Sequence, residues 1–173
     1  VMPLVDMVNI MSYDLVGGYS RETGHHTPLY SGAKTAQSAD RAVKWLIKNG
    51  VDASKLIMGS AFYARVWKEV PPAKNGLYQP GIFMQGIAFR QFHEYFGYSS
   101  GFTYHWDKKA KAGWQYAPAK KLFATFDDER SITEKSNYIK KQHLGGIMFW
   151  ELSHDKEKNG LIDLIHQKLN QKP

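Results

Sequence analysis

Three hydrophobic runs, each ending in polar or aromatic side chains, constrain the fold of this chain more than any other feature. They cover residues 5–14, 55–63 and 145–151 and are rich in Val, Ile, Leu, Met and Phe. Continuous apolar runs of this length are typical of strands that are buried on both faces of a sheet. Segments with helical spacing of apolar residues lie between or after them, near 36–49, 131–142 and 160–169. This alternation of strand and helix predicts an α/β fold with a parallel sheet.

Two local signals predict where helices begin. Thr35 or Ser38 can cap the helix near 36–49, because a hydroxyl oxygen accepts a hydrogen bond from an unpaired N–H of the first turn. The run Ser131-Ile132-Thr133-Glu134 has the spacing of a capping box and predicts the start of the helix near 131–142.

The alternation of strand and helix is interrupted between residues 66 and 121. Proline and glycine separate short aromatic runs there, and one helix is expected at 89–96. We interpret 66–121 as an inserted α+β subdomain. The remaining segments, 1–65 and 122–173, then form the main α/β unit, and a strand is expected at 122–126.

The charge distribution and the apolar runs of the chain bear on which classes of partner it could bind. The net charge is +7, from 23 basic and 16 acidic residues, but the lysines are dispersed and no nucleic-acid-binding motif accompanies them. The chain has no cysteine, and none of its apolar runs approaches the ~20 residues that span a membrane. We therefore expect neither nucleic acid nor a membrane as a partner, and the sequence calls for no cofactor.

The polar and aromatic residues that could form a functional site lie where the expected strands end. The first run ends in Tyr13-Asp14, the second in Tyr63 with Arg65 close behind, and the third in Trp150-Glu151. Ligands of parallel α/β folds bind at the carboxyl ends of the strands, so these groups would converge. Rings that stack on a pyranose, with acids and hydroxyls that take its hydrogen bonds, favour a neutral sugar. The alternative is that each strand merely ends at the surface.

Other residues leave alternatives open. Asp14 and Glu151 could form a glycosidase carboxylate pair if they lie about 5 to 10 Å apart. His25-His26 could suggest a metal, but adjacent histidines point apart in most backbones, so we expect hydrogen bonding within the loop and no metal. The tryptophans of the middle region could line a groove or fill a small core; these are Trp67, Trp106 and Trp114.

Several motifs, in the same order along the chain, resemble family 18 glycoside hydrolases of the chitinase type. Met11-Ser12-Tyr13-Asp14-Leu15 resembles the sixth-strand Met-x-Tyr-Asp motif, and residues 24–30 resemble the Gly-His-x-x-Pro-Leu-Tyr stretch that follows it. The run 55–65 is similar to the seventh strand, with Ala64 where the family usually has glycine. The segment 126–135 and the run 145–151 resemble the family's Tyr-Asp-Asp…Ser-Ile…Lys segment and its eighth strand. The middle region has the position and size of the chitinase insertion domain.

The resemblance implies a fold and a set of roles. The fold would be strands six to eight of a (β/α)8 TIM barrel with an inserted α+β subdomain, and the substrate would be chitin or N-acetylglucosamine oligosaccharides. Tyr13 and Asp14 would hold and polarise the substrate's N-acetyl group in a substrate-assisted retaining mechanism. Five further residues would contact the sugar: Met11, Tyr19, Tyr63, Arg65 and Trp150. Glu151 would then support the site rather than act as its acid.

One motif of the family does not occur in these 173 residues. The family's catalytic acid lies in a fourth-strand Asp-x-x-Asp-x-Asp-x-Glu run, so the resemblance implies a C-terminal portion that is inactive alone. The open strand edges of such a portion would favour self-association. The intact protein would be secreted or periplasmic, as its polymeric substrate implies. The alternative is a portion of a catalytically inactive, chitin-binding lectin of the same family.

Overall fold

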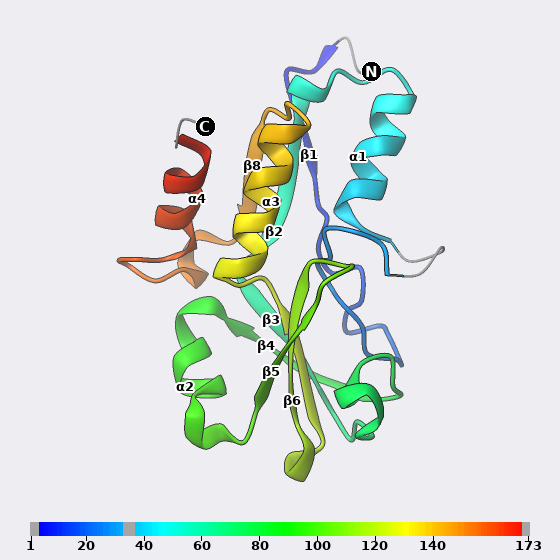
Figure 1. Ribbon diagram of the computed structural model, residues 1–173, viewed down its shortest axis with the longest axis vertical. Helices are drawn as coiled ribbons and strands as arrows, with labels where there is room; N and C mark the ends of the chain where they lie inside the picture. Colours follow the sequence, from blue (N-terminus) through cyan, green and yellow to red (C-terminus); the bar gives the residue numbers. More distant parts are fainter. Residues whose placement is uncertain (1–3, 33–36, 171–173) are drawn as a thin grey trace.

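The computed structural model describes residues 4–32 and 37–170, and it contains two β-sheets (Figure 1). The smaller sheet is parallel, with the strand order β1-β2-β8. The larger sheet is antiparallel, with the order β4-β3-β7-β6-β5. The parallel sheet lies in the upper half of Figure 1 with helices α1, α3 and α4, and the antiparallel sheet lies below it with α2. The structure is therefore a mixed α/β fold.

The parallel sheet is built from the three hydrophobic runs. Its strands are β1 (Val8–Ile10), β2 (Leu56–Ala61) and β8 (Gly146–Trp150). The backbones of β1 and β2 approach so closely that a Cβ atom on Gly59 would lie 2.4 Å from the carbonyl oxygen of Ile10. A side chain is thus excluded at Gly59. Just beyond β1, the Ser12 hydroxyl donates to the Gly59 carbonyl at 3.0 Å.

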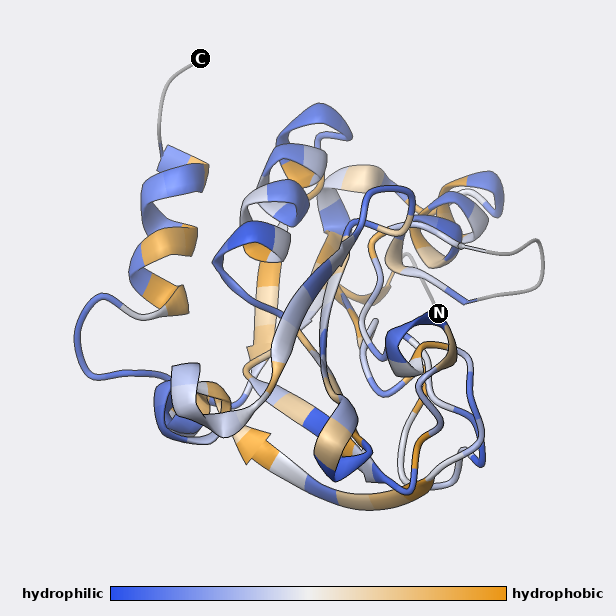
Figure 2. Cartoon of the chain, turned by 60° about the horizontal axis from the view of Figure 1, so that its bottom comes forward, coloured by the Kyte–Doolittle hydropathy of each residue, from blue (hydrophilic) through white to orange (hydrophobic). Residues whose placement is uncertain are grey.

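Three helices flank the parallel strands: α1 (Ala39–Lys48), α3 (Glu129–Lys141) and α4 (Leu161–Asn170). In Figure 2 these helices mix hydrophobic and hydrophilic residues, as amphipathic helices do. Val43 of α1 and Tyr138 and Ile139 of α3 pack in one core with Leu56 and Met58 of β2. None of the helices in the described residues has the length and apolarity needed to span a bilayer.

The helix caps were predicted only in part. Ser38 caps α1, since its side chain accepts a hydrogen bond from the Arg41 N–H. Thr35, the alternative cap, lies outside the described residues. The capping box of α3 was misplaced in the sequence analysis: Asp128 is the N-cap, and Ser131 is the third helical residue that completes the box. A carboxylate at this position also interacts favourably with the positive end of the helix, which a serine cannot do.

The antiparallel sheet consists of β3 (Tyr63–Lys68), β4 (Ile82–Ala88), β5 (Thr103–Asp107), β6 (Ala112–Ala117) and β7 (Leu122–Phe126). Helix α2 (Phe92–Phe96) follows β4. Single turns of 3-10 helix lie at Ala53–Lys55, Ala73–Gly76, Phe89–Gln91, Tyr98–Ser100, Pro118–Lys120 and Leu152–His154.

One expected strand belongs to a different sheet from the one predicted. Residues 122–126 form β7, but β7 pairs antiparallel with β3 and β6 rather than with the parallel strands. The antiparallel sheet therefore spans residues 63–126, somewhat more than the predicted insertion. Trp67 and Trp114 lie in the core of this sheet with Phe123, which resolves their role in favour of packing. Trp106 is partly buried and stacks under the guanidinium of Arg130 at 4.2 Å.

A buried ion pair lies where the two sheets meet. Lys135 of α3 and Asp127 after β7 are both fully buried, and Nζ of Lys135 is 2.6 Å from Oδ2 of Asp127. The same carboxylate accepts the Ala61 N–H at the end of β2 (3.0 Å) and, through Oδ1, the Ser131 hydroxyl (2.7 Å). A buried charge is tolerated only when it is paired and hydrogen-bonded, and this pair meets both conditions.

Candidate functional site

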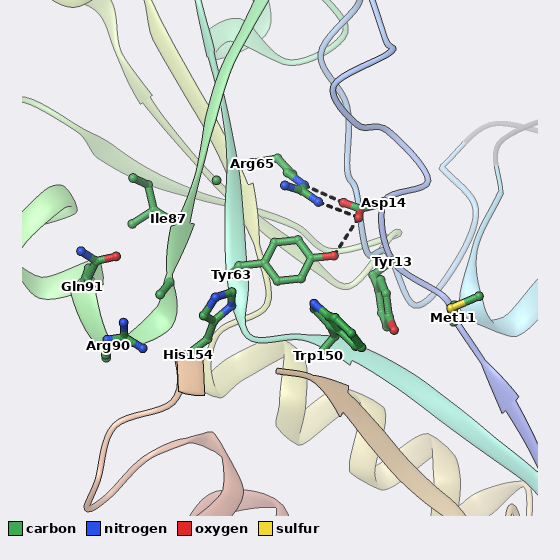
Figure 3. Close-up of a pocket in the computed structure, with 12 residues that line it drawn as sticks. Met11, Tyr13, Asp14, Tyr63, Arg65, Ile87, Arg90, Gln91, Trp150 and His154 are labelled. Carbon is green, nitrogen blue, oxygen red and sulfur yellow. Dashed lines mark hydrogen bonds and ion pairs between the residues drawn. The ribbon is translucent and has the colours of Figure 1, made fainter. Parts of the chain in front are cut away.

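A pocket of about 490 Å³ opens at the carboxyl ends of β1 and β8, beside the start of β3 (Figure 3). Six of the residues assigned to the site from sequence line it: Met11, Tyr13, Asp14, Tyr63, Arg65 and Trp150. They lie far apart in the sequence and meet because β1, β2 and β8 run parallel and β3 continues from β2. The structure therefore brings these side chains together in one cavity.

Asp14 is the centre of the hydrogen bonding in this pocket. Arg65 donates to both of its carboxylate oxygens, from Nε to Oδ1 and from Nη2 to Oδ2, each at 2.7 Å. The Tyr63 hydroxyl donates to Oδ2 at 2.9 Å. Bidentate pairing of this kind fixes both the position and the orientation of a carboxylate. Figure 3 shows the three side chains converging from opposite sides of the pocket.

These contacts fix the charge states in the pocket. Burial alone would raise the pKa of Asp14, but the neighbouring His26 ring, the Arg65 guanidinium and the Tyr63 hydroxyl outweigh burial and hold this pKa well below its usual range. The hydrogen bond to Asp14 raises the pKa of Arg65. Burial, followed by the charge of Asp14, raises the pKa of Tyr63. At neutral pH the cluster is thus a carboxylate, a guanidinium and a neutral phenol.

Aromatic rings form the walls around this cluster. Trp150 is 57% exposed, so a broad part of its ring is open to the pocket and to solvent. The Tyr13 ring meets the Tyr63 ring edge to face, with centroids 6.3 Å apart. Burial and the nearby charge of Asp14 raise the pKa of Tyr13, so its hydroxyl remains a donor at neutral pH. Exposed rings beside fixed polar groups suit a ligand with both apolar and polar faces.

The other half of the pocket was missed in the sequence analysis. It is lined by Gly86, Ile87, Ala88, Arg90, Gln91 and His154. Antiparallel pairing of β3 with β4 sets Gly86, Ile87 and Ala88 opposite Arg65, Ala64 and Tyr63, and Arg90 and Gln91 follow directly. The available signal was an apolar run at 82–88, but the partner and register of that run could not be derived from one sequence.

Tyr19 lies outside this pocket. Its ring is 76% exposed, and its hydroxyl donates to the backbone carbonyl of Asp14. Tyr19 lines a neighbouring shallow hollow with Ile82 and Phe83. In this structure it therefore braces the turn that carries Asp14.

The structure also places the acid and the two histidines for which the sequence left alternatives open. Glu151 is not among the residues that line the pocket; its side chain accepts a hydrogen bond from Ser153 and lies 3.4 Å from Nε2 of His154. Nε2 of His25, in the loop beyond β1, is 3.2 Å from Oδ2 of Asp107 at the end of β5. His26 is fully buried beside Asp14. The described residues contain no cluster of three or more His, Cys, Asp or Glu that could hold a metal.

Residues 1–155 match the sequence profile of the glycosyl hydrolases family 18. The chain belongs to this family. It is 34% identical to chitinase A1 of Niallia circulans over 91% of its own length and 25% of that protein. It is 32% identical to the oviduct-specific glycoprotein of Mus musculus over 94% of its length and 24% of that protein.

Among solved structures, the chain resembles chitinase ChiW of a Paenibacillus species with a TM-score of 0.91 and 34% identity, covering 99% of this chain and 20% of that one. The chain thus spans about a quarter of the length of the two curated relatives named above. The fold and the family are shared along nearly all of this sequence.

Within this family 18 chain, the pocket combines one fixed anion, two neutral phenols and one exposed indole. Asp14 can accept an N–H and stabilise positive charge, and the Tyr13 hydroxyl can donate to a carbonyl oxygen. The indole of Trp150 offers a face on which a sugar ring can stack. Together these groups can bind a ligand that combines an apolar face with an N–H donor and a carbonyl acceptor.

Proposed function

We propose that this sequence is part of a hydrolase that cleaves β-1,4 links between N-acetylglucosamine units, and that it contributes the half-site for the N-acetyl group. The observation that carries the proposal is the ionised Asp14, held by Arg65 and Tyr63 in a pocket that also contains Tyr13 and Trp150. The name of the Niallia circulans relative, a chitinase, supports the same substrate class.

The proposed mechanism is the retaining, substrate-assisted one. The oxygen of the substrate's N-acetyl group attacks the anomeric carbon while the bond to the leaving oxygen breaks, and a glutamic acid protonates that oxygen. Positive charge develops on the acetamido group, where the Asp14 carboxylate accepts its N–H and stabilises the charge. The Tyr13 hydroxyl donates to the acetamido oxygen and directs it toward the anomeric carbon. Water then opens the cyclic intermediate with retention.

The other lining residues take supporting roles in this proposal. Trp150 forms the floor beneath the distorted sugar, and Met11 lines the same subsite. Tyr63 and Arg65 hold Asp14 and reach the sugar hydroxyls. The Asp-x-x-Asp-x-Asp-x-Glu run is absent from these 173 residues, so we expect the acid to come from outside them. In this proposal the parallel strands are strands six to eight of a (β/α)8 barrel, residues 66–121 form the insertion domain, and the intact protein is secreted or periplasmic.

A second candidate is a chitin-binding lectin without catalysis. Its support is the similarity to oviduct-specific glycoprotein, a name that describes no enzyme, together with a pocket whose groups can equally hold a sugar without cleaving it. The residue at the end of the missing motif distinguishes the two candidates. Glutamic acid there supports the enzyme, and any other residue supports the lectin.

The first experiment compares this chain with the longer parent protein in hydrolysis of a chromogenic N-acetylchitobioside. We expect the parent to cleave and this chain to be inactive. In the parent, Asp14→Ala should lower kcat by about 10²- to 10³-fold, because it removes a charge that acts in the transition state. Asp6→Ala is the matched control, because Asp6 is an exposed aspartate at the other end of β1.

Two outcomes would contradict the proposal. Cleavage by this chain alone would mean that the acid lies within it, with Glu151 as the first suspect. An inactive parent that still binds N-acetylglucosamine oligomers would support the lectin instead.

We further propose that this chain self-associates when produced alone. In the described residues, β1 and β8 each pair on one side only, with β2 between them. Such edges present unpaired N–H and C=O groups that can pair with a second copy. We expect dimers or larger species in light scattering at micromolar concentration. A monodisperse monomer would contradict this.

A further inference from the structure

His26 is a fully buried histidine that the proposed mechanism does not use. Its Nδ1 lies 3.6 Å from Oδ1 of Asp14, close but beyond hydrogen-bond length. Within the described residues, neither ring nitrogen has a hydrogen-bond partner. A buried polar group without a partner costs about 1–3 kcal/mol, so its presence calls for an explanation.

The backbone of His26 also contacts the segment that carries Asp14. The His26 carbonyl accepts the Leu15 N–H at 3.0 Å. Asp14 itself has a φ of 55°, in the left-handed region that residues other than glycine rarely adopt. A backbone in this conformation persists only where its surroundings hold it, and His26 supplies one of the contacts that do so.

His26 is in turn held by a fully buried set of groups. Its N–H donates to the Thr125 hydroxyl of β7 at 3.3 Å. The next residue, Thr27, has its hydroxyl 2.6 Å from Nζ of Lys135 and 3.1 Å from Oδ2 of Asp127. The ion pair at the junction of the sheets therefore fixes the loop from which His26 faces Asp14.

The charged and titratable groups around the ring define its protonation state. Asp14 faces it from the turn after β1, Tyr63 and Arg65 from β3, and Asp127 and Lys135 from the sheet junction. Burial lowers the pKa of His26, and this effect outweighs the nearby carboxylates of Asp14 and Asp127, which act to raise it. The ring is therefore neutral at pH 7, and only one of its nitrogens carries a proton.

We propose that His26 is a positioning residue for Asp14: its Nδ1–H is directed at the carboxylate from a different element than Arg65 and Tyr63, and it limits how far that carboxylate can turn. The positioning of Asp14 by His26 needs no residue outside this chain. Its consequence for catalysis rests on the proposed function. Three supports from two elements would keep Asp14 oriented toward an N-acetyl group while its backbone remains in the left-handed conformation.

The first test is ¹⁵N NMR of the histidine rings in this 173-residue chain at neutral pH. We expect His26 to carry its proton on Nδ1, with signals assigned by their loss in His26→Phe. In Asp14→Ala the proton should move toward Nε2, because the acceptor is gone. The signals of His25, which faces Asp107, should stay unchanged. A proton on Nε2 in the wild type, or no response to Asp14→Ala, would overturn the proposal.

The second test is kinetic and uses the longer parent protein. His26→Phe should lower kcat by about 10- to 100-fold with little change in KM, because misplacement of a catalytic group mainly affects the transition state. His26→Asn, which keeps an N–H donor, should recover part of that loss. His25→Asn is the matched control, a neighbouring buried histidine outside the pocket.

The two tests separate this inference from the proposed function. Equal losses in His25→Asn and His26→Phe, with matching losses of Tm, would mean a merely structural role and overturn the positioning claim. A parent without hydrolysis would defeat the proposed function, and the NMR result would then decide the position of His26 by itself.

Discussion

The two sheets of this molecule differ in how far their strands are buried. In the antiparallel sheet, the inner strands β3, β7 and β6 are largely buried, and Trp67, Trp114 and Phe123 form a core between its own elements. In the parallel sheet, only β2 is buried along its length. The residues of β8 are half-buried, and Trp150 at its end is 57% exposed.

The pocket lies between these two sheets and draws on both. Tyr63 and Arg65, which hold Asp14, belong to the well-buried antiparallel sheet. Met11 and Trp150, which are open to a ligand, lie at the ends of strands whose outer edges are unpaired in the described residues. The molecule thus separates rigid support for the carboxylate from the accessible surface that meets the substrate.

The largest effect is expected from breaking the ion pair that joins the sheets. Lys135→Met leaves the buried Asp127 without its cation, which should lower the free energy of unfolding by about 3–5 kcal/mol. Urea unfolding followed by circular dichroism measures this. Lys140→Met, an exposed lysine of the same helix, is the control and should change the stability by less than about 0.5 kcal/mol. A loss below about 1 kcal/mol for Lys135→Met would show that the junction carries little of the stability.

A direct comparison of two phenylalanines tests the difference between the sheets. Phe123 of β7 is fully buried, so Phe123→Ala should cost about 3–5 kcal/mol. Phe149 of β8 stacks on Phe62 with centroids 4.5 Å apart but is only half-buried, so Phe149→Ala should cost about half as much. Both values come from the same urea titration. Equal losses would mean that β8 is as well packed as β7.

The sequence predicted those parts of the fold that depend on local pattern. The runs that became β1, β2 and β8 are identified by their apolar composition, and β2, the middle strand, is buried as that composition predicts, whereas β1 and β8 are only partly buried in the described residues. Tyr13, Asp14 and Trp150 could be assigned to one site because parallel strands end at one edge.

The parts that depend on pairing between distant segments were not predictable. Residues 122–126 have the composition of a strand in either sheet, and only the register with β3 and β6 decides between them. Arg65 was assigned to the sugar, and its bidentate contact with Asp14 depends on the turn between β2 and β3. The ion pair of Lys135 with Asp127 likewise could not be predicted from local pattern, because a lysine in a helix is usually exposed.

The smallest effect is expected at a partly exposed contact between the two regions. Asp107 ends β5, and its Oδ2 lies 3.2 Å from Nε2 of His25 in the loop beyond β1, while Oδ1 accepts the N–H groups of Lys109 and Ala110. The contact with His25, together with these backbone hydrogen bonds, outweighs burial and lowers the pKa of Asp107 to about 2. Unlike Asp127, this carboxylate is partly exposed, so solvent screens its interactions.

We therefore expect Asp107→Asn to cost only about 1 kcal/mol at pH 7. Because the pKa of Asp107 is lower in the folded than in the unfolded chain, its contribution is complete above about pH 4 and is lost as the pH falls toward 2. The difference in stability between wild type and Asp107→Asn, measured by urea unfolding from pH 7 to pH 2.5, should shrink across that interval. Asp6→Asn, at an exposed aspartate outside this contact, is the matched control. A constant difference for Asp107→Asn would mean that the charge of Asp107 does not stabilise the contact between the two regions.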